Sequence, residues 1–139
     1  MELPCRRFGR TNINMPVLSL GGMRFQESWD DLKFSEISHK EQKKVENILN
    51  LANKFGLNHL ETAKYYGTSE VQLGMGFKST NKIPSIIQTK IPPNRDPKLF
   101  ELELLKSFEK LKVNKIDLLS IHGINSPEHL HQAVCDAGC

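Results

Sequence analysis

The chain has 139 residues, of which 38% are hydrophobic and 25% are charged, and its net charge is +3. This composition is typical of a globular protein, and the dispersed basic residues argue against nucleic acid as a partner. No apolar run approaches the length of a membrane span, and the first residues lack the apolar core of a signal peptide. We therefore expect no membrane partner.

The first elements in chain order are a hairpin and a strand. Residues 6–8 and a stretch around Ile13 flank the turn-forming segment 9–12 (GRTN), which predicts a small β-hairpin. The apolar run 17–21 (VLSLG) predicts the first strand of a sheet. The connection from Met23 to Lys40 is long, and loops of that length in compact domains are often functional.

Helix signals predict four helices, at 39–55, 69–77, 97–112 and 127–135. Ser38 with Glu41 forms a capping-box pattern before the first helix, and Gly56 offers a left-handed C-cap after it. Asp-Pro and Ser-Pro pairs open the third and fourth helices. In the third helix, the expected buried residues are Leu104, Leu105, Phe108 and Leu111.

Three more strands are predicted between these helices, at 58–62, 85–90 and 117–122. Their apolar runs are typical of strands that are covered on both faces. Because strands and helices alternate, right-handed crossovers should place the strands parallel in one sheet. The sequence therefore predicts an α/β fold.

Four residues follow the carboxyl ends of these strands: Glu61, Tyr66, Lys90 and His122. In (β/α) barrels the chemistry lies at this end of the strands. Each residue alone has an ordinary structural interpretation, such as a packed tyrosine or a surface lysine. Their joint placement favours a catalytic set, because a phenol ionises near pH 10 and becomes a useful acid when a cation such as Lys90 stabilises the phenolate.

Several segments together resemble the N-terminal portion of the aldo/keto reductase family. They are residues 8–11 (FGRT), 20–24 (LGGMR), 56–67 (GLNHLETAKYYG), 69–74 (SEVQLG), 89–90 (TK) and 105–122. The resemblance implies a (β/α)₈ TIM barrel, which needs about 250 residues. We therefore expect residues 1–139 to form a truncated domain, the N-terminal half of such a barrel with an N-terminal β-hairpin and about four βα units.

The resemblance also implies hydride transfer between NADP(H) and a small carbonyl substrate. It aligns the family's proton-donating tyrosine with Tyr66 rather than Tyr65. Glu61, where the family more often has Asp, would pair with Lys90 and hold it in place. His122 would donate a hydrogen bond to the substrate carbonyl.

Cofactor contacts are implied for Gly22, Met23 and Arg24, together with Glu61 and Tyr66. In the family, most contacts to the pyrophosphate and adenine come from later strands, so we expect the chain alone to bind NADP(H) weakly or not at all. A second interpretation stays open, in which the chain is a non-catalytic remnant or an interaction module that lacks the cofactor site. An open half-barrel would expose two sheet edges and an apolar interior face, which predicts self-association or pairing with a complementing second half.

The three cysteines, Cys5, Cys135 and Cys139, are an odd number and indicate a reducing compartment, so we expect a cytoplasmic protein. His131, Cys135 and Cys139 recur at four-residue spacing, which could bring zinc ligands to one helix face. Because the set lacks a Cys-x-x-Cys pair and Gly138 disfavours a continuous helix, we expect no metal site.

Overall fold

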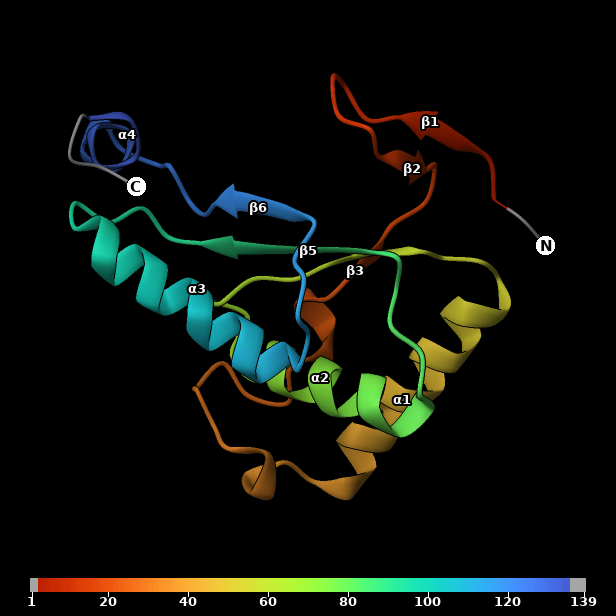
Figure 1. Cartoon of the computed structure of the whole chain (residues 1–139). Helices are drawn as coiled ribbons and strands as arrows, with labels where there is room; N and C mark the ends of the chain where they lie inside the picture. Colours follow the sequence, from red (N-terminus) through yellow and green to blue (C-terminus); the bar gives the residue numbers. More distant parts are fainter. Residues whose placement is uncertain (1–2, 136–139) are drawn as a thin grey trace.

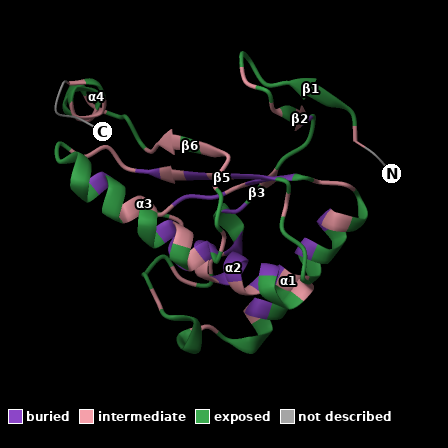
Figure 2. Cartoon of the chain, viewed as in Figure 1, coloured by how far each residue is buried: buried purple, intermediate pink, exposed green. Residues whose placement is uncertain are grey.

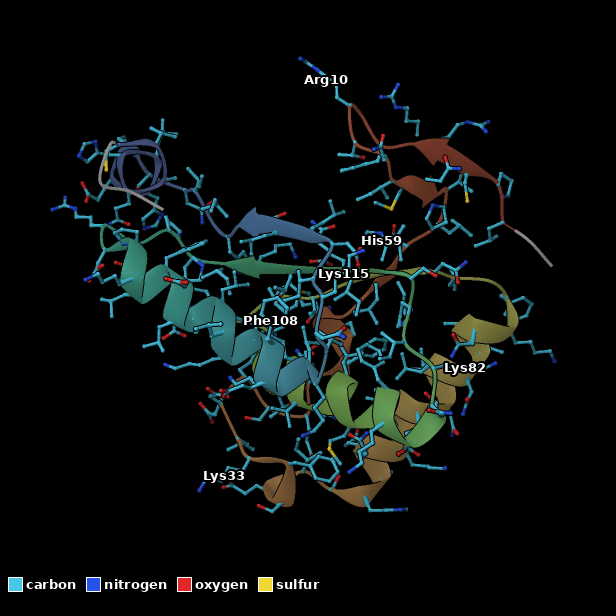
Figure 3. The ribbon with its side chains drawn as sticks, viewed as in Figure 1. Arg10, Lys33, His59, Lys82, Phe108 and Lys115 are labelled. Atoms are coloured by element: carbon cyan, nitrogen blue, oxygen red, sulfur yellow. The ribbon has the colours of Figure 1, made fainter. Side chains whose placement is uncertain are left out.

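The computed structural model describes residues 3–135, which form a parallel sheet with most of the helices on one face and a separate hairpin (Figure 1). The strand order is β3 (Leu20–Gly21), β4 (His59–Glu61), β5 (Ile86–Ile91) and β6 (Leu118–Ile121). All three neighbouring pairs are parallel, which confirms the predicted topology. β1 (Cys5–Arg7) and β2 (Asn14–Pro16) form the expected antiparallel hairpin, with Arg10 at its tip (Figure 3).

The predicted helices are present with small changes in their bounds. They are α1 (His39–Lys54), α2 (Ser69–Thr80), α3 (Pro97–Leu111) and α4 (Pro127–Val134). The Ser38 side chain accepts a hydrogen bond from the Glu41 amide, and Gly56 adopts the left-handed conformation with φ of 71°. α2 continues past the predicted end at residue 77 because Asn81 supplies its left-handed C-cap.

The long connection after β3 contains two short 3₁₀ helices, η1 (Met23–Phe25) and η2 (Phe34–Glu36). No helix in residues 3–135 is long and apolar enough to cross a membrane.

The hydrophobic core lies between the sheet and helices α1, α2 and α3 (Figure 2). Leu60 of β4 and Ile87 of β5 point to this side, where they pack with Val45, Leu49, Leu73, Phe77 and Leu111. Burial of such side chains is worth about 1.5–3 kcal/mol each, so this layer supplies much of the fold's stability. α4 contributes no buried residue.

Two details of the predicted pattern are wrong. In the expected strand 17–21 only residues 20 and 21 pair with β4, because the Val17 amide donates instead to the Pro4 carbonyl in the hairpin. In α3, Leu105 is 52% exposed, whereas Ser107 is buried and donates to Glu70. The buried residues of α3 are Phe100, Ser107 and Leu111, so the buried face includes a polar contact to α2 that the apolar pattern did not predict.

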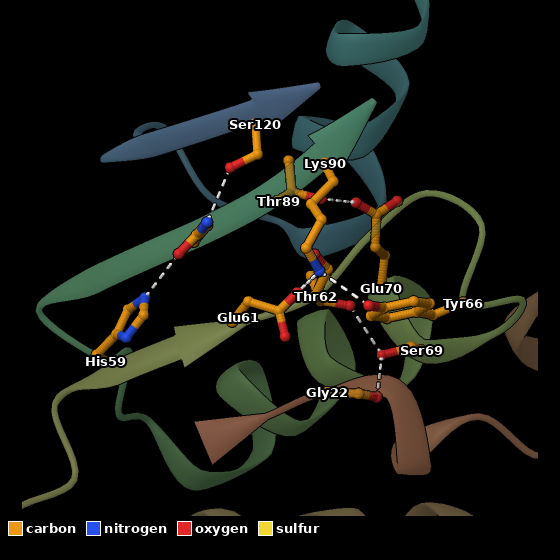
Figure 4. Close-up of polar contacts among 11 residues, drawn as sticks. Gly22, His59, Glu61, Thr62, Tyr66, Ser69, Glu70, Thr89, Lys90 and Ser120 are labelled. Carbon is orange, nitrogen blue, oxygen red and sulfur yellow. Dashed lines mark hydrogen bonds and ion pairs between the residues drawn. The ribbon is translucent and has the colours of Figure 1, made fainter. Parts of the chain in front are cut away.

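The second face of the sheet is mainly polar, so the expectation of an apolar interior face is wrong. On this face His59 contacts Gln88, Gln88 contacts Ser120, and Glu61 is paired with Lys90 (Figure 4). They alternate along their strands with Leu60, Ile87 and the other residues that face the helices. The polar side chains satisfy one another across neighbouring strands.

A glycine allows α2 and α3 to approach closely. A Cβ at Gly74 would collide with the backbone carbonyl of Lys110, whereas a Cβ at Gly76 would meet side chains, of which the end of Leu49 is the nearest. We expect Gly74→Ala to lower the free energy of unfolding by about 1–3 kcal/mol through overpacking. Gly76→Ala should cost less, because Leu49 can move and alanine favours the helix.

Urea unfolding of both variants beside the unmodified chain measures the difference. A Gly74→Ala variant as stable as Gly76→Ala would contradict the proposed close approach of the two helices.

Candidate active site

Three of the four predicted catalytic residues meet at the carboxyl ends of β4 and β5 (Figure 4). Glu61 ends β4, and its carboxylate is ion-paired with the Lys90 ammonium group. Lys90 Nζ also lies 2.8 Å from the Tyr66 hydroxyl and 4.6 Å from the centre of that ring. A phenol, a cation and a carboxylate therefore form one contiguous group.

Tyr66 rather than Tyr65 faces the lysine. The Tyr66 amide donates to the Ala63 carbonyl, and the Ser69 amide donates to the Tyr66 carbonyl, so a tight turn fixes the residue between β4 and α2. Tyr65 is 57% exposed, and Lys64 Nζ lies 5.5 Å from its ring centre. This geometry distinguishes two adjacent tyrosines that composition alone could not separate.

His122, just after β6, completes the predicted set. Its amide donates to the Ile91 carbonyl, and its ring lies edge-on to Tyr66 with centroids 5.6 Å apart. Burial, followed by the positive charge of Lys90, lowers the pKa of His122. The ring is therefore neutral at pH 7 and has one N–H to donate. Its Nδ1 atom is buried and has no hydrogen-bond partner within residues 3–135.

The ammonium of Lys90 is held in partly dry surroundings. Burial lowers the pKa of Lys90, while the Glu61 carboxylate beside it favours the charged form. Lys90 Nζ also donates to the Thr62 carbonyl at 3.4 Å. These contacts hold the ammonium group next to the Tyr66 hydroxyl.

The predicted cofactor residues take different positions. Gly22 is buried, and its amide donates to the Glu61 carbonyl at 2.6 Å. A Cβ at Gly22 would lie 2.8 Å from that carbonyl oxygen, so the position requires glycine and ties β3 to β4. Met23 and Arg24 are exposed in η1. Contact of these three residues with a cofactor stays a prediction.

The long loop after β3 lies against the turn that carries Tyr66. The Thr68 amide donates to the Ser28 carbonyl at 3.0 Å, and the Glu27 amide donates to the Thr68 hydroxyl at 2.9 Å. Gly67 has a φ of 51°, and a Cβ there would collide with Ser28. The loop therefore lies beside the site.

A buried acid that the sequence analysis did not identify as functional supports the site from the helix side. Glu70, which is 1% exposed, accepts hydrogen bonds from Thr89 at 2.7 Å and Ser107 at 3.2 Å. Burial raises the pKa of Glu70, although the two hydroxyls and Lys110 oppose this shift. The presence of Glu70 in the first turn of α2 was visible in the sequence, but its burial depends on partners that lie far along the chain.

The cavities in the described part of the chain include the following two. One of about 310 Å³ adjoins His122 and Tyr65, and its other lining residues are Pro92, Pro93, Gly123, Asn125, His129 and Gln132. A larger one of about 550 Å³ lies between α2 and α3, lined by residues such as Phe77 and Lys112, and contains none of the predicted site residues. Of these two, the smaller cavity is the one that adjoins a predicted catalytic residue, His122.

The zinc pattern involves Cys139, which lies outside the described residues. Within residues 3–135, no group of three His, Cys, Asp or Glu side chains is arranged to hold a metal ion.

Removing the positive charge of Lys90 should raise the pKa of His122. In the unmodified chain, burial and the Lys90 ammonium group both lower the pKa of His122. We therefore expect the ring to titrate at a higher pH in Lys90→Met. An NMR pH titration of the His122 ring measures this change. Lys64→Met is the matched control, since Lys64 lies over Tyr65 and pairs with Glu103. An equal rise in both variants would contradict the assigned cause.

Glu70→Gln should increase the free energy of unfolding at neutral pH. The folded-state pKa of Glu70 is raised, so its stability contribution is fully present below the ordinary value of 4.5 and is lost as the pH rises. Glutamine can still accept from Thr89 and has no charge to bury. The advantage of the variant should therefore shrink as the pH falls from neutral toward about 4.5 and change little below it, which urea unfolding at several pH values tests. A constant difference would count against a buried ionised Glu70.

The site can be compared with known proteins. The aldo/keto reductase family model matches residues 17–136, whereas no curated protein matches the chain. Among solved structures, a protein from Pseudomonas aeruginosa assigned to the aldo-keto reductases has a TM-score of 0.76 at 22% identity over 98% of this chain. A thermostable aldo-keto reductase in complex with the inhibitor epalrestat has a TM-score of 0.67 at 24% identity over 94% of this chain.

A third structure, an aldo/keto reductase from Klebsiella pneumoniae in complex with NADP and acetate, gives a TM-score of 0.63 at 15% identity over 97% of this chain. This chain spans about half the length of these structures, covering 56%, 49% and 47% of them. The likeness shows the fold, which is the N-terminal half of a (β/α)₈ barrel with a hairpin before it. The match over residues 17–136 places the chain in the aldo/keto reductase family.

Proposed function

We propose that this chain supplies the catalytic residues of an NADP(H)-dependent reductase that converts a small aldehyde or ketone to an alcohol. The observation that carries the proposal is the 2.8 Å contact between the Tyr66 hydroxyl and Lys90 Nζ, with Glu61 paired to the same ammonium. NADP(H), when bound, would supply the hydride that adds to the carbonyl carbon, and Tyr66 would give its proton to the carbonyl oxygen. Lys90 stabilises the phenolate that remains.

His122 orients the carbonyl in this proposal. Its lowered pKa keeps the ring neutral, so it can donate one N–H without adding a second positive charge beside Lys90. The edge-on contact with Tyr66 brings both donors to the same region, next to the 310 Å³ cavity. Two donors at one oxygen would polarise the carbonyl and fix its direction for hydride attack.

Gly22, Met23 and Arg24 are proposed to contact NADP(H) together with Glu61 and Tyr66. The support is their position: η1 follows β3 directly, and Gly22 bonds to the backbone of Glu61. The family relative from Klebsiella pneumoniae was solved with NADP, which makes this cofactor the first to test.

Further barrel strands are proposed as the partner of this sheet. Within residues 3–135, β3 and β6 each have a strand neighbour on one side only. Unpaired strand edges attract additional strands, either from a complementing half of a barrel or from a second copy of the chain.

Cys5 and Cys135 are free thiols, which supports a cytoplasmic location.

Tyr66→Phe should abolish carbonyl reduction and leave NADPH binding nearly unchanged, because it removes the proton donor and little contact surface. The measurement is the rate of NADPH consumption with a small aldehyde. It is made on the chain itself and on a fusion that supplies the remaining strands from an aldo/keto reductase.

Tyr65→Phe is the matched control, since it removes the same atom from the neighbouring ring, and its rate should stay close to that of the unmodified protein. Loss of activity in Tyr65→Phe but not in Tyr66→Phe would reverse the assignment of the donor. Absence of carbonyl reduction in the unmodified fusion would reject the proposed function and favour a non-catalytic role.

A further inference from the structure

A chain of side-chain hydrogen bonds crosses the polar face of the sheet on the amino-terminal side of the site (Figure 4). Ser19 Oγ lies 2.7 Å from His59 Nδ1, and His59 Nε2 lies 3.1 Å from Gln88 Oε1. Gln88 Nε2 donates to Ser120 Oγ at 2.9 Å. We call these four residues the polar relay. It begins at the residue before β3 and includes one residue from each of β4, β5 and β6.

The polar relay lies one layer below the candidate catalytic residues. His59 precedes Glu61 by two positions, Gln88 precedes Lys90 by two, and Ser120 precedes His122 by two. Side chains two positions apart on a strand point to the same face, about 6.5–7 Å apart along it. Glu61, Lys90 and His122 therefore each follow a relay residue on the same face of the same strand.

The hydrogen bonds give the relay a direction. Because the Gln88 amide N–H donates to Ser120, its carbonyl oxygen faces His59 and requires a donor there. His59 must therefore carry a proton on Nε2. Burial lowers the pKa of His59, so at neutral pH its Nδ1 is free to accept from the Ser19 hydroxyl. Each relay contact thus has one defined donor and one defined acceptor.

We propose that Ser19, His59, Gln88 and Ser120 are positioning residues, which fix the lateral spacing of the strand ends that carry Glu61, Lys90 and His122. The backbone pairing alone is short, since β3 has two residues and β4 has three. A slip of one residue would turn every inward side chain to the other face. The relay opposes such a slip, because displacement would leave several partly buried polar groups unpaired. Its catalytic consequence rests on the function proposed above, whereas its geometry does not.

The test uses the full chain, labelled with ¹⁵N and ¹³C, and follows its five histidines and the Lys90 side chain by NMR. His59→Phe assigns the His59 ring signals. We expect the unmodified chain to show His59 as the neutral tautomer with the proton on Nε2. Gln88→Met keeps a side chain of similar length but removes the amide. It should abolish the single tautomer and shift the Lys90 and His122 side-chain signals.

Gln42→Met is the matched control, because Gln42 is a buried glutamine whose amide donates to the Gln72 carbonyl between α1 and α2, away from the relay. It should leave the His59, Lys90 and His122 signals unchanged. If Gln88→Met fails to fold, Ser120→Ala, which removes only the last acceptor, should shift the same signals. A His59 proton on Nδ1, or Lys90 and His122 signals that respond equally to the control, would overturn the inference.

Activity gives a separate readout. In the fusion with the remaining strands of an aldo/keto reductase, Gln88→Met should lower kcat by at least about tenfold with little change in KM for NADPH. A misplacement of about 1 Å can cost about 10²-fold in rate. An unchanged kcat beside shifted NMR signals would also overturn the positioning role. An unmodified fusion without activity would reject the proposed function, and the NMR comparison would still decide whether the relay positions these side chains.

Discussion

The alternation of side chains along three short parallel strands is the constraint on which the rest of the structure depends. Leu60 and Ile87 face the helices and enter the hydrophobic core, while Glu61 and Lys90 face the opposite side and pair with each other. The period of two along a strand makes both outcomes follow from a single register. Packing of the core therefore places the charged residues of the site as well.

The turn between β4 and α2 depends on buried polar contacts rather than on apolar packing. Ser69 bonds both to Thr62 and to the carbonyl of Gly22, and so connects α2 to β4 and to the residue after β3. Glu70 extends the connection to β5 and α3. Buried groups of this kind are costly when unpaired and rigid when satisfied. These contacts restrain the segment that carries Tyr66, and a catalytic phenol requires a fixed position.

The sequence was most informative where local signals decide the outcome. Capping at Ser38 and Gly56, the apolar runs and their alternation with helices correctly predicted the parallel sheet and the end of the sheet where Glu61 and Lys90 meet. Expectations that depended on distant partners were less successful. The expected first strand was too long because Val17 bonds to the hairpin, and Leu105 is exposed because the buried face of α3 is the one that brings Ser107 to Glu70.

A double-mutant cycle between Glu61 and Lys90 measures whether these two side chains form one partly buried unit beside Tyr66. Urea unfolding at neutral pH would be measured for the unmodified chain, Glu61→Gln, Lys90→Met and the double variant. We expect a coupling energy of about 1 kcal/mol or more, within the range of about 0.5–3 kcal/mol found for contacting residues. Effects that add within about 0.3–0.5 kcal/mol would contradict it.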